Sequence, residues 1–279
     1  MRISENIRIE WLILKGSFVI PVAWYLIFCL NYYSSSPLPT GICEWFDCRE
    51  LCFQPLKTIV IALVLICSVL YLKEHYMLFA TFLLFFLCLT ILSLDESNGN
   101  FSENGIITTI FFAQFVAYLF KRLSLNENIV QNRIQFSLQI IAAVYTLSGI
   151  QKLWRSGLAW FTTDVPKFNL EILRLHYCGY AASGEETLML KGNMIATFVK
   201  EHLIITQFIL FLALSSELLC GVILIKRKVA FYYGIILTLM HLGIYLVMDI
   251  FYPAIMIPMI VFAINPLFFF YKQLSKIYK

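Results

Sequence analysis

Residues 203–248 read LIITQFILFLALSSELLCGVILIKRKVAFYYGIILTLMHLGIYLVM. Two apolar runs flank the basic turn Lys226-Arg227-Lys228, and each run has the length of about 20 residues that a helix needs to cross a bilayer. The alternation of polar and apolar residues that is typical of membrane barrels is absent from both runs. The stretch therefore predicts two membrane-spanning helices joined by a short basic turn.

The whole chain has the composition of a helical membrane protein. Of its 279 residues, 60% are hydrophobic and 14% are charged, whereas soluble chains have about 45–50% apolar and about 25% charged residues. This composition excludes a soluble enzyme, a disordered chain and a nucleic-acid-binding domain. We expect an all-α transmembrane bundle with a single domain over residues 1–279 and about eight spans. The predicted spans are 11–32, 56–73, 75–94, 105–121, 134–153, 203–225, 229–248 and 250–270.

The distribution of Lys and Arg predicts the orientation of the bundle. Basic residues gather near both termini, in the 121–133 loop and in the 226–228 turn, whereas the 95–104 loop carries acidic residues only. Because basic loops stay in the cytoplasm, we expect both termini to be cytoplasmic. The longer segments 33–55 and 154–202 then face outward. We expect a multi-pass protein of a bacterial cytoplasmic membrane, with the lipid bilayer as its first partner and no nucleic acid.

Four cysteines fall in these two outward segments: Cys43, Cys48, Cys52 and Cys178. An outward, oxidising location favours disulfides, and four cysteines allow two disulfides in three different pairings. The alternative is a zinc site, but the C-x4-C-x3-C spacing is atypical and no His lies nearby. We therefore favour disulfides and expect no metal.

Three ionisable residues lie inside predicted spans, where charge is costly and marks a candidate functional site. Lys152 lies about 27 Å along its span. There it either snorkels to the outer interface beside Trp154 and Trp160 or, when desolvated, acts as a base. His241 is either an interhelical hydrogen-bonding residue or part of a catalytic site. Glu217 lies deeper, so we expect it to have a structural role and not to pair directly with Lys152.

One face of the 134–153 span carries the small and polar residues Tyr145, Ser148, Gly149 and Lys152, which follow the i, i+3, i+4, i+7 pattern. Such a face contacts other helices or a cavity rather than lipid. Lys152 is therefore the candidate general base, and Tyr145 and His241 are candidates to orient or hydrogen-bond the reacting oxygen.

Residues 145–161, YTLSGIQKLWRSGLAWF, resemble the Y-x-x-[AS]-G-[hydrophobic]-x-K-L-x-x-x-x-W segment of the HTTM-domain family. That family includes vitamin K-dependent γ-glutamyl carboxylase and smaller bacterial proteins. Residues 237–262 look like the His-containing span and the Phe/Met-rich last span of the family, and Glu217 falls where relatives often carry an acidic residue. Together these matches cover residues 134–270.

The resemblance implies a chemistry for Lys152. In the carboxylase, the matching Lys deprotonates reduced vitamin K on the lumenal side, so a reduced quinone is the implied cofactor class. The small bacterial members imply a secreted peptide as substrate and a partner maturation protein. However, Gln151 replaces a second Lys of the carboxylase, segment 154–202 differs, and we expect no large lumenal region for peptide recruitment. The carboxylation of glutamate is therefore not transferred.

Two other function classes remain as alternatives. The first is a non-catalytic membrane partner in the export of, or immunity to, a secreted peptide, which would bind through segment 154–202. The second is a transporter, but Pro253, Pro258 and Pro266 cluster in the last span without a counterpart in the first half, unlike the repeated broken helices of transporters.

Overall fold

A computed structural model describes residues 5–32, 39–97, 105–122, 129–162, 165–250 and 252–277. These residues are helical, with no β-strand in the described ranges, which confirms the predicted all-α fold. Seven of the described helical stretches are long and apolar enough to cross a membrane, and the predicted span at 105–121 is a shorter apolar helix, Gly105–Phe120. The seven long stretches are Ile9–Asn31, Leu56–Lys73, Met77–Ser97, Gln131–Trp160, Leu203–Leu224, Arg227–Met248 and Pro253–Ser275.

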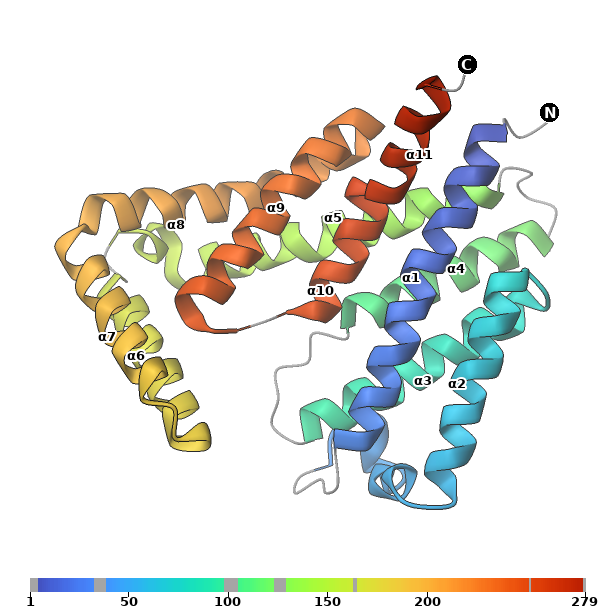
Figure 1. Ribbon diagram of the computed structural model, residues 1–279, viewed down its shortest axis with the longest axis horizontal. Helices are drawn as coiled ribbons and strands as arrows, with labels where there is room; N and C mark the ends of the chain where they lie inside the picture. Colours follow the sequence, from blue (N-terminus) through green and yellow to red (C-terminus); the bar gives the residue numbers. More distant parts are fainter. Residues whose placement is uncertain are drawn as a thin grey trace. The chain divides into compact units, whose positions relative to one another are not determined.

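The helices form two compact units, each of which is described by itself. The first unit consists of residues 1–141 and 253–279, and the second unit consists of residues 142–252. Helix α5 (Ile129–Ser156) begins in the first unit and ends in the second (Figure 1). The single domain over residues 1–279 stays a prediction.

The first unit contains four further long helices near its N-terminal end and a broken helix near its C-terminal end. The helix at the C-terminal end is interrupted by a π-helical turn that directly follows Pro258, a residue without the backbone N–H that a regular α-helix requires. The elements are α1 (Glu5–Tyr32), α2 (Leu56–Lys73), α3 (Met77–Ser97), α4 (Gly105–Arg122), α10 (Pro253–Pro258), the π-helix Met259–Ile264 and α11 (Pro266–Ile277).

Aromatic rings from four of these elements form the core of the first unit. Phe18 of α1 lies 5.2 Å from Phe111 of α4 and 5.0 Å from Phe262 of the π-helix, measured between ring centroids. Tyr71 of α2 lies 6.0 Å from Phe111. All four residues are fully buried. Because lipid tails are as apolar as these side chains, such close packing rather than hydrophobic transfer holds membrane helices together.

A buried polar chain adds a second link between helices of the first unit. The Tyr71 hydroxyl donates to Gln114 Oε1 at 2.6 Å, and Gln114 Nε2 donates to Ser137 Oγ at 3.2 Å. Ser137 in turn donates to the Arg133 carbonyl of its own helix. The chain joins α2, α4 and α5 and satisfies groups that lipid could not hydrogen-bond.

The second unit contains two amphipathic helices that the sequence did not predict. Segment 154–202, expected only as a long outward segment, folds into a short 3-10 turn (Gly157–Trp160) and the helices α6 (Val165–Ser183) and α7 (Glu186–Glu201), which pack side by side (Figure 1). The other elements are α8 (Leu203–Leu218), the 3-10 turn Leu219–Leu224 and α9 (Arg227–Met248).

Polar contacts fix the pair α6–α7 to the end of α9. The His176 ring nitrogen Nε2 lies 3.0 Å from the Val247 carbonyl, and Lys191 Nζ lies 3.0 Å from Asp249 Oδ1. Asp249 also ends α9 in a left-handed conformation. Gly192 of α7 leaves room for the His176 side chain, because a Cβ at this position would lie 2.6 Å from His176 Cβ.

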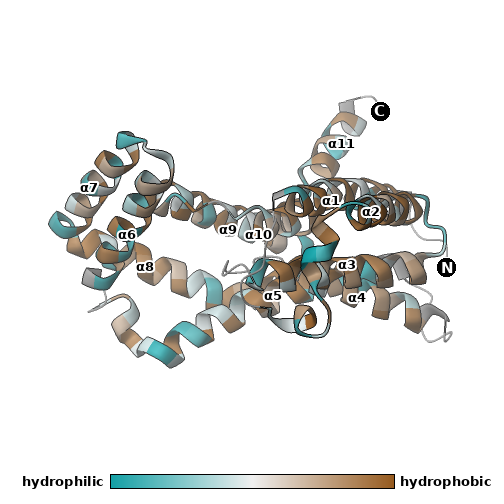
Figure 2. Ribbon diagram, turned by 90° about the horizontal axis from the view of Figure 1, so that it is seen from below, coloured by the Kyte–Doolittle hydropathy of each residue, from teal (hydrophilic) through white to brown (hydrophobic). Residues whose placement is uncertain are grey.

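Colouring by hydropathy separates the two kinds of helix. In Figure 2 the ribbon is mostly hydrophobic along α2 and α3, whereas hydrophilic and hydrophobic residues alternate along α6 and α7. Neither α6 nor α7 is among the candidate membrane spans.

Of the four cysteines in the predicted outward segments, two form a disulfide and two are free thiols. Cys43 and Cys48 form a disulfide between the 3-10 turns Gly41–Glu44 and Cys48–Cys52 of the first unit. Cys52 is buried as a free thiol beside this disulfide, and Cys178 is free and exposed on α6. Burial raises the pKa of the Cys52 thiol, which the charge of Lys57 offsets in part.

Thiol labelling of the folded protein tests this arrangement. Without reductant, we expect mass spectrometry to find Cys43 linked to Cys48, and Cys178 to react with an alkylating reagent at once. Cys52 reacts only after unfolding, because the thiol is buried and protonated. A disulfide that contains Cys52, or labelling of Cys52 as fast as that of Cys178, would contradict the pairing.

Candidate functional site

The candidate site is built on the predicted face of α5. Tyr145 and Gly149 are buried and Lys152 is half-buried, whereas Leu147 and Ile150 on the opposite side are exposed. The small and polar residues of α5 therefore face other helices of the second unit, and the large apolar residues face outward.

Gly149 allows α8 to approach the backbone of α5. A Cβ at Gly149 would lie 3.0 Å from the Leu218 side chain and 3.1 Å from the Leu218 backbone nitrogen. These distances are those of a helix crossing in which one partner has no side chain, as is common between membrane helices. The crossing places Glu217, the residue before Leu218, next to the turn of α5 that carries Lys152.

Lys152 and Glu217 form a direct ion pair in the structure. Lys152 Nζ lies 2.5 Å from Glu217 Oε1, and the side chains are 28% and 6% exposed. The expectation that Glu217 lies too deep to pair with Lys152 is thus wrong. The expectation counted the depth of each residue from the end of its own span, as if the helices were parallel and level. In the structure α5 and α8 cross one helical turn from Lys152, which brings the two residues together.

An aromatic ring also lies close to the Lys152 amine. The Trp160 ring centroid lies 5.1 Å from Lys152 Nζ, within the range of a cation–π interaction. Gly157 adopts φ +57°, a left-handed conformation that favours glycine, at the turn between α5 and Trp160. Trp154, predicted as a second interface anchor, is 89% exposed.

Tyr145 and His241 form a second polar pair. The Tyr145 hydroxyl lies 2.6 Å from His241 Nε2, and both residues are buried between α5 and α9. Either atom donates, depending on the His tautomer. The Tyr252 ring lies 5.9 Å from the His241 ring. The predicted interhelical hydrogen bond of His241 is therefore present, and its partner is a predicted site residue.

Two buried polar atoms of this site have no hydrogen-bond partner. They are Glu217 Oε2 and His241 Nδ1, in residues that are 4% and 6% exposed. Buried polar groups are nearly always hydrogen-bonded, and an exception calls for an explanation such as a bound ligand or water. The site thus offers one free carboxylate acceptor and one free ring nitrogen beside the amine of Lys152.

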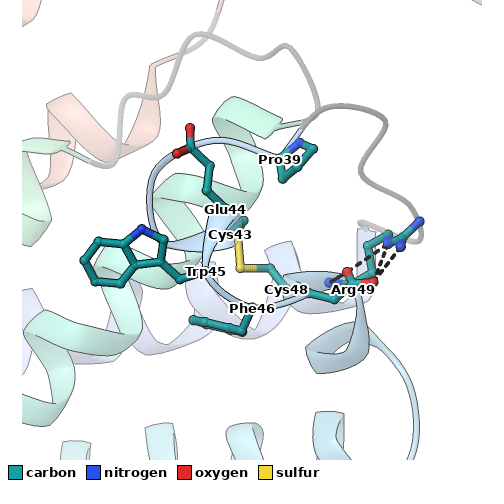
Figure 3. Close-up of a pocket in the computed structure, with 8 residues that line it drawn as sticks. Pro39, Cys43, Glu44, Trp45, Phe46, Cys48 and Arg49 are labelled. Atoms are coloured by element: carbon teal, nitrogen blue, oxygen red, sulfur yellow. Dashed lines mark hydrogen bonds and ion pairs between the residues drawn. A yellow bond between two sulfur atoms is a disulfide. The ribbon is translucent and has the colours of Figure 1, made fainter.

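A separate hollow lies in the 3-10 region of the first unit. Its volume is about 390 Å³, and it is lined by Pro39, Glu44, Trp45, Phe46, Asp47, Arg49 and the disulfide (Figure 3). The Arg49 guanidinium holds Asp47 through hydrogen bonds of 2.5–2.9 Å and lowers the pKa of this carboxyl. Asp47 and Arg49 are therefore engaged with each other, and Glu44 is the third charged residue of the lining.

The described residues contain no group of three His, Cys, Asp or Glu that is able to hold a metal ion. Comparisons with protein-family models, with curated proteins and with solved structures find no match to this chain. The interpretation of the site therefore rests on its own residues and on the sequence resemblance stated above.

Enlarging Gly149 tests the helix crossing. We expect Gly149→Leu to lower the unfolding free energy by about 1–3 kcal/mol, because the new side chain overlaps Leu218. Gly243→Leu is the matched control, since a Cβ there meets no atom within 4 Å. Thermal unfolding in detergent measures both, and equal midpoints for the two variants would rule the crossing out.

Removing each partner of the ion pair tests its burial. Lys152→Met leaves the Glu217 carboxylate buried and unpaired, which costs about 3–5 kcal/mol. Glu217→Gln costs less, because Lys152 is more exposed and keeps the Trp160 ring. The double variant loses less than the sum of the two. Unfolding by denaturant measures all three; an unchanged stability in Lys152→Met, with exposed Lys200→Met as control, would refute the buried pair.

Proposed function

We propose that this protein is an integral-membrane enzyme of the HTTM type in which Lys152 acts as a general base on a substrate reached from the outer face. The observation that supports this proposal best is the pairing of Lys152 with Glu217 beside the pair Tyr145–His241, with two buried polar atoms left free. A substrate with hydrogen-bonding groups completes these contacts when it binds.

The geometry gives each residue a role in this proposal. A protonated amine cannot take up a proton, so Lys152 works as a base only after it has passed its proton on. Glu217 Oε1 lies 2.5 Å from the amine and is the acceptor in reach. Tyr145 lies two turns before Lys152 on the same face of α5, and His241 of α9 is hydrogen-bonded to the Tyr145 hydroxyl. In this proposal the pair orients the reacting oxygen of the substrate.

The resemblance supplies the substrate class of this proposal. A bound reduced quinone would bring a phenolic hydroxyl, an acidic hydrogen-bond donor. The free acceptor Glu217 Oε2 and the amine of Lys152 fit such a group, because a donor needs an acceptor in a buried site. A secreted peptide is the further substrate, with a maturation protein as partner and no metal. The outward face of a bacterial cytoplasmic membrane is the proposed location.

One observation favours the alternative of a non-catalytic partner. Leu190, Met194 and Phe198 lie one turn apart on α7 and are 57%, 74% and 48% exposed. The opposite side of α7 already packs against α6 through Gly192 and Ala196. An apolar stripe outside the candidate spans is suited to binding another protein.

Replacing Lys152 by Arg separates the two functions. Arg keeps the positive charge and the pair with Glu217, but it cannot give up its proton. We expect Lys152→Arg to insert into the membrane and to lose turnover by about 10²–10⁴-fold. The readouts are oxidation of a reduced naphthoquinone by isolated membranes and the masses of secreted peptides, each compared with wild type.

The controls decide between the outcomes. Lys200→Arg, an exposed change on α7, retains wild-type readouts. If Lys152→Arg also retains them while Met194→Asp abolishes the peptide changes, the base is refuted and the partner function is supported. If the wild type itself alters neither quinone nor peptide, the proposed enzyme is refuted.

A further inference from the structure

Arg133 is the largest fully buried side chain of the described residues, and it lies in the first unit near the start of α5. Its guanidinium carbon lies 3.9 Å from the Trp11 ring centroid and 4.8 Å from that of Tyr118. The charged group thus lies within cation–π range of two aromatic rings, one from α1 and one from α4. This site is separate from the one proposed above.

Three hydrogen-bonding atoms of Arg133 and Tyr118 are not satisfied. Arg133 Nε and Nη1 and the Tyr118 hydroxyl are buried and have no hydrogen-bond partner. A buried charge without a partner is costly, and cation–π contacts offset about 0.5–2 kcal/mol of such a cost. The guanidinium is always protonated, so its unpartnered donors call for an acceptor that carries negative charge.

The neighbouring groups are already engaged. Glu74 and Tyr71 are the residues that act electrostatically on Arg133. Glu74 Oε1, however, accepts from Trp11 Nε1 at 2.8 Å and from Lys15 Nζ at 3.0 Å, and the Tyr71 hydroxyl donates to Gln114. Neither residue hydrogen-bonds the guanidinium.

The positive and negative charges of the residues around Arg133 do not balance. Trp11, Lys15, Glu74, Tyr118 and Arg133, named here the Arg133 cluster, hold two cations and one carboxylate. One positive charge is left over in a setting where Arg133 is 1% and Lys15 9% exposed. A single bound anion makes the cluster neutral.

The position of the cluster indicates the kind of anion. It joins the start of α1, the C-cap of α2, the last turns of α4 and the start of α5, ends that the basic residues predict to be cytoplasmic. Basic pockets between helices on this side of a membrane bind phosphate-bearing lipid head groups. The Glu74 side chain is 41% exposed and marks where the cluster opens to the surface.

We propose that the Arg133 cluster binds a phosphate group, carried either by an anionic lipid or by free phosphate. Arg forms strong charge-assisted hydrogen bonds to phosphate oxygens. Arg133 Nε and Nη1 and the Tyr118 hydroxyl supply donors to the phosphate oxygens, and Lys15 supplies the second positive charge. Glu74 keeps Trp11 and Lys15 in place through its shared oxygen.

Binding to purified protein tests the proposal. The ligands are phosphatidylglycerol, diacylglycerol with the same acyl chains, and inorganic phosphate; the readouts are native mass spectrometry and the shift of the thermal unfolding midpoint. We expect phosphate-bearing ligands to be retained and to raise the midpoint, and diacylglycerol to do neither. Arg133→Gln weakens this binding about tenfold or more, because charge-assisted hydrogen bonds are lost.

The variants and competitors make the outcome decisive. Arg155→Gln, an exposed arginine on the same helix, is the control and binds as wild type. If Arg133→Gln does not fold, Arg133→Lys and Lys15→Gln give the same comparison with the helix ends intact. Lipid that inorganic phosphate displaces identifies free phosphate as sufficient, whereas lipid that resists it identifies the head group. Equal binding in wild type and Arg133 variants, or no binding of either phosphate, overturns the proposal.

Discussion

The close crossing of α5 and α8 at Gly149 is the constraint on which the second unit depends. Without a side chain at this position, the α8 backbone comes within reach of α5, and the residue before the contact is Glu217. The carboxylate then meets Lys152 one turn further along α5. A lysine that could have snorkelled to the interface is instead held between a buried carboxylate and the Trp160 ring. The site thus follows from one small residue and from the low dielectric that makes an unpaired charge costly.

Each unit contains an ion pair between a lysine and a glutamate, but the polar groups left without a partner differ between the units. Lys15 pairs with Glu74 in the first unit, and Lys152 pairs with Glu217 in the second. The Arg133 cluster holds one excess positive charge, whereas Glu217 and His241 give the second unit a free carboxylate oxygen and a free ring nitrogen. The bilayer core offers no water to hydrogen-bond such unpaired charges and polar atoms. They therefore indicate which ligand each unit is suited to: an anion in the first and a group that hydrogen-bonds Glu217 Oε2 and His241 Nδ1 in the second.

The spans could be predicted from the sequence because hydrophobic length alone decides whether a helix crosses a bilayer. The shared face of Tyr145, Gly149 and Lys152 was predictable too, since helical periodicity does not depend on the partner. The pair Lys152–Glu217 was not, because a crossing angle brings together residues whose depths differ when counted along parallel helices. Helices α6 and α7 were missed because their apolar residues are interrupted by charged ones, so they lack the continuous runs that mark spans. Their amphipathic spacing, with Ile172 and His176 four residues apart on the buried side, was the available indication.

The ion pair changes what Lys152 means for function. A lone lysine in a span suggests a base by its position, but a paired lysine has its proton held by Glu217, so its reactivity depends on what disturbs that pair. A substrate that donates to Glu217 Oε2 shares the carboxylate charge between two donors and so weakens the ion pair. The same hydrogen bond makes Glu217 a poorer acceptor for the Lys152 proton. The balance of these two effects decides how basic the amine becomes when a substrate is bound. The hydrogen bond between Tyr145 and His241 satisfies one nitrogen of the imidazole ring. The other nitrogen, Nδ1, has no partner and is the atom of His241 that a substrate would contact in this proposal.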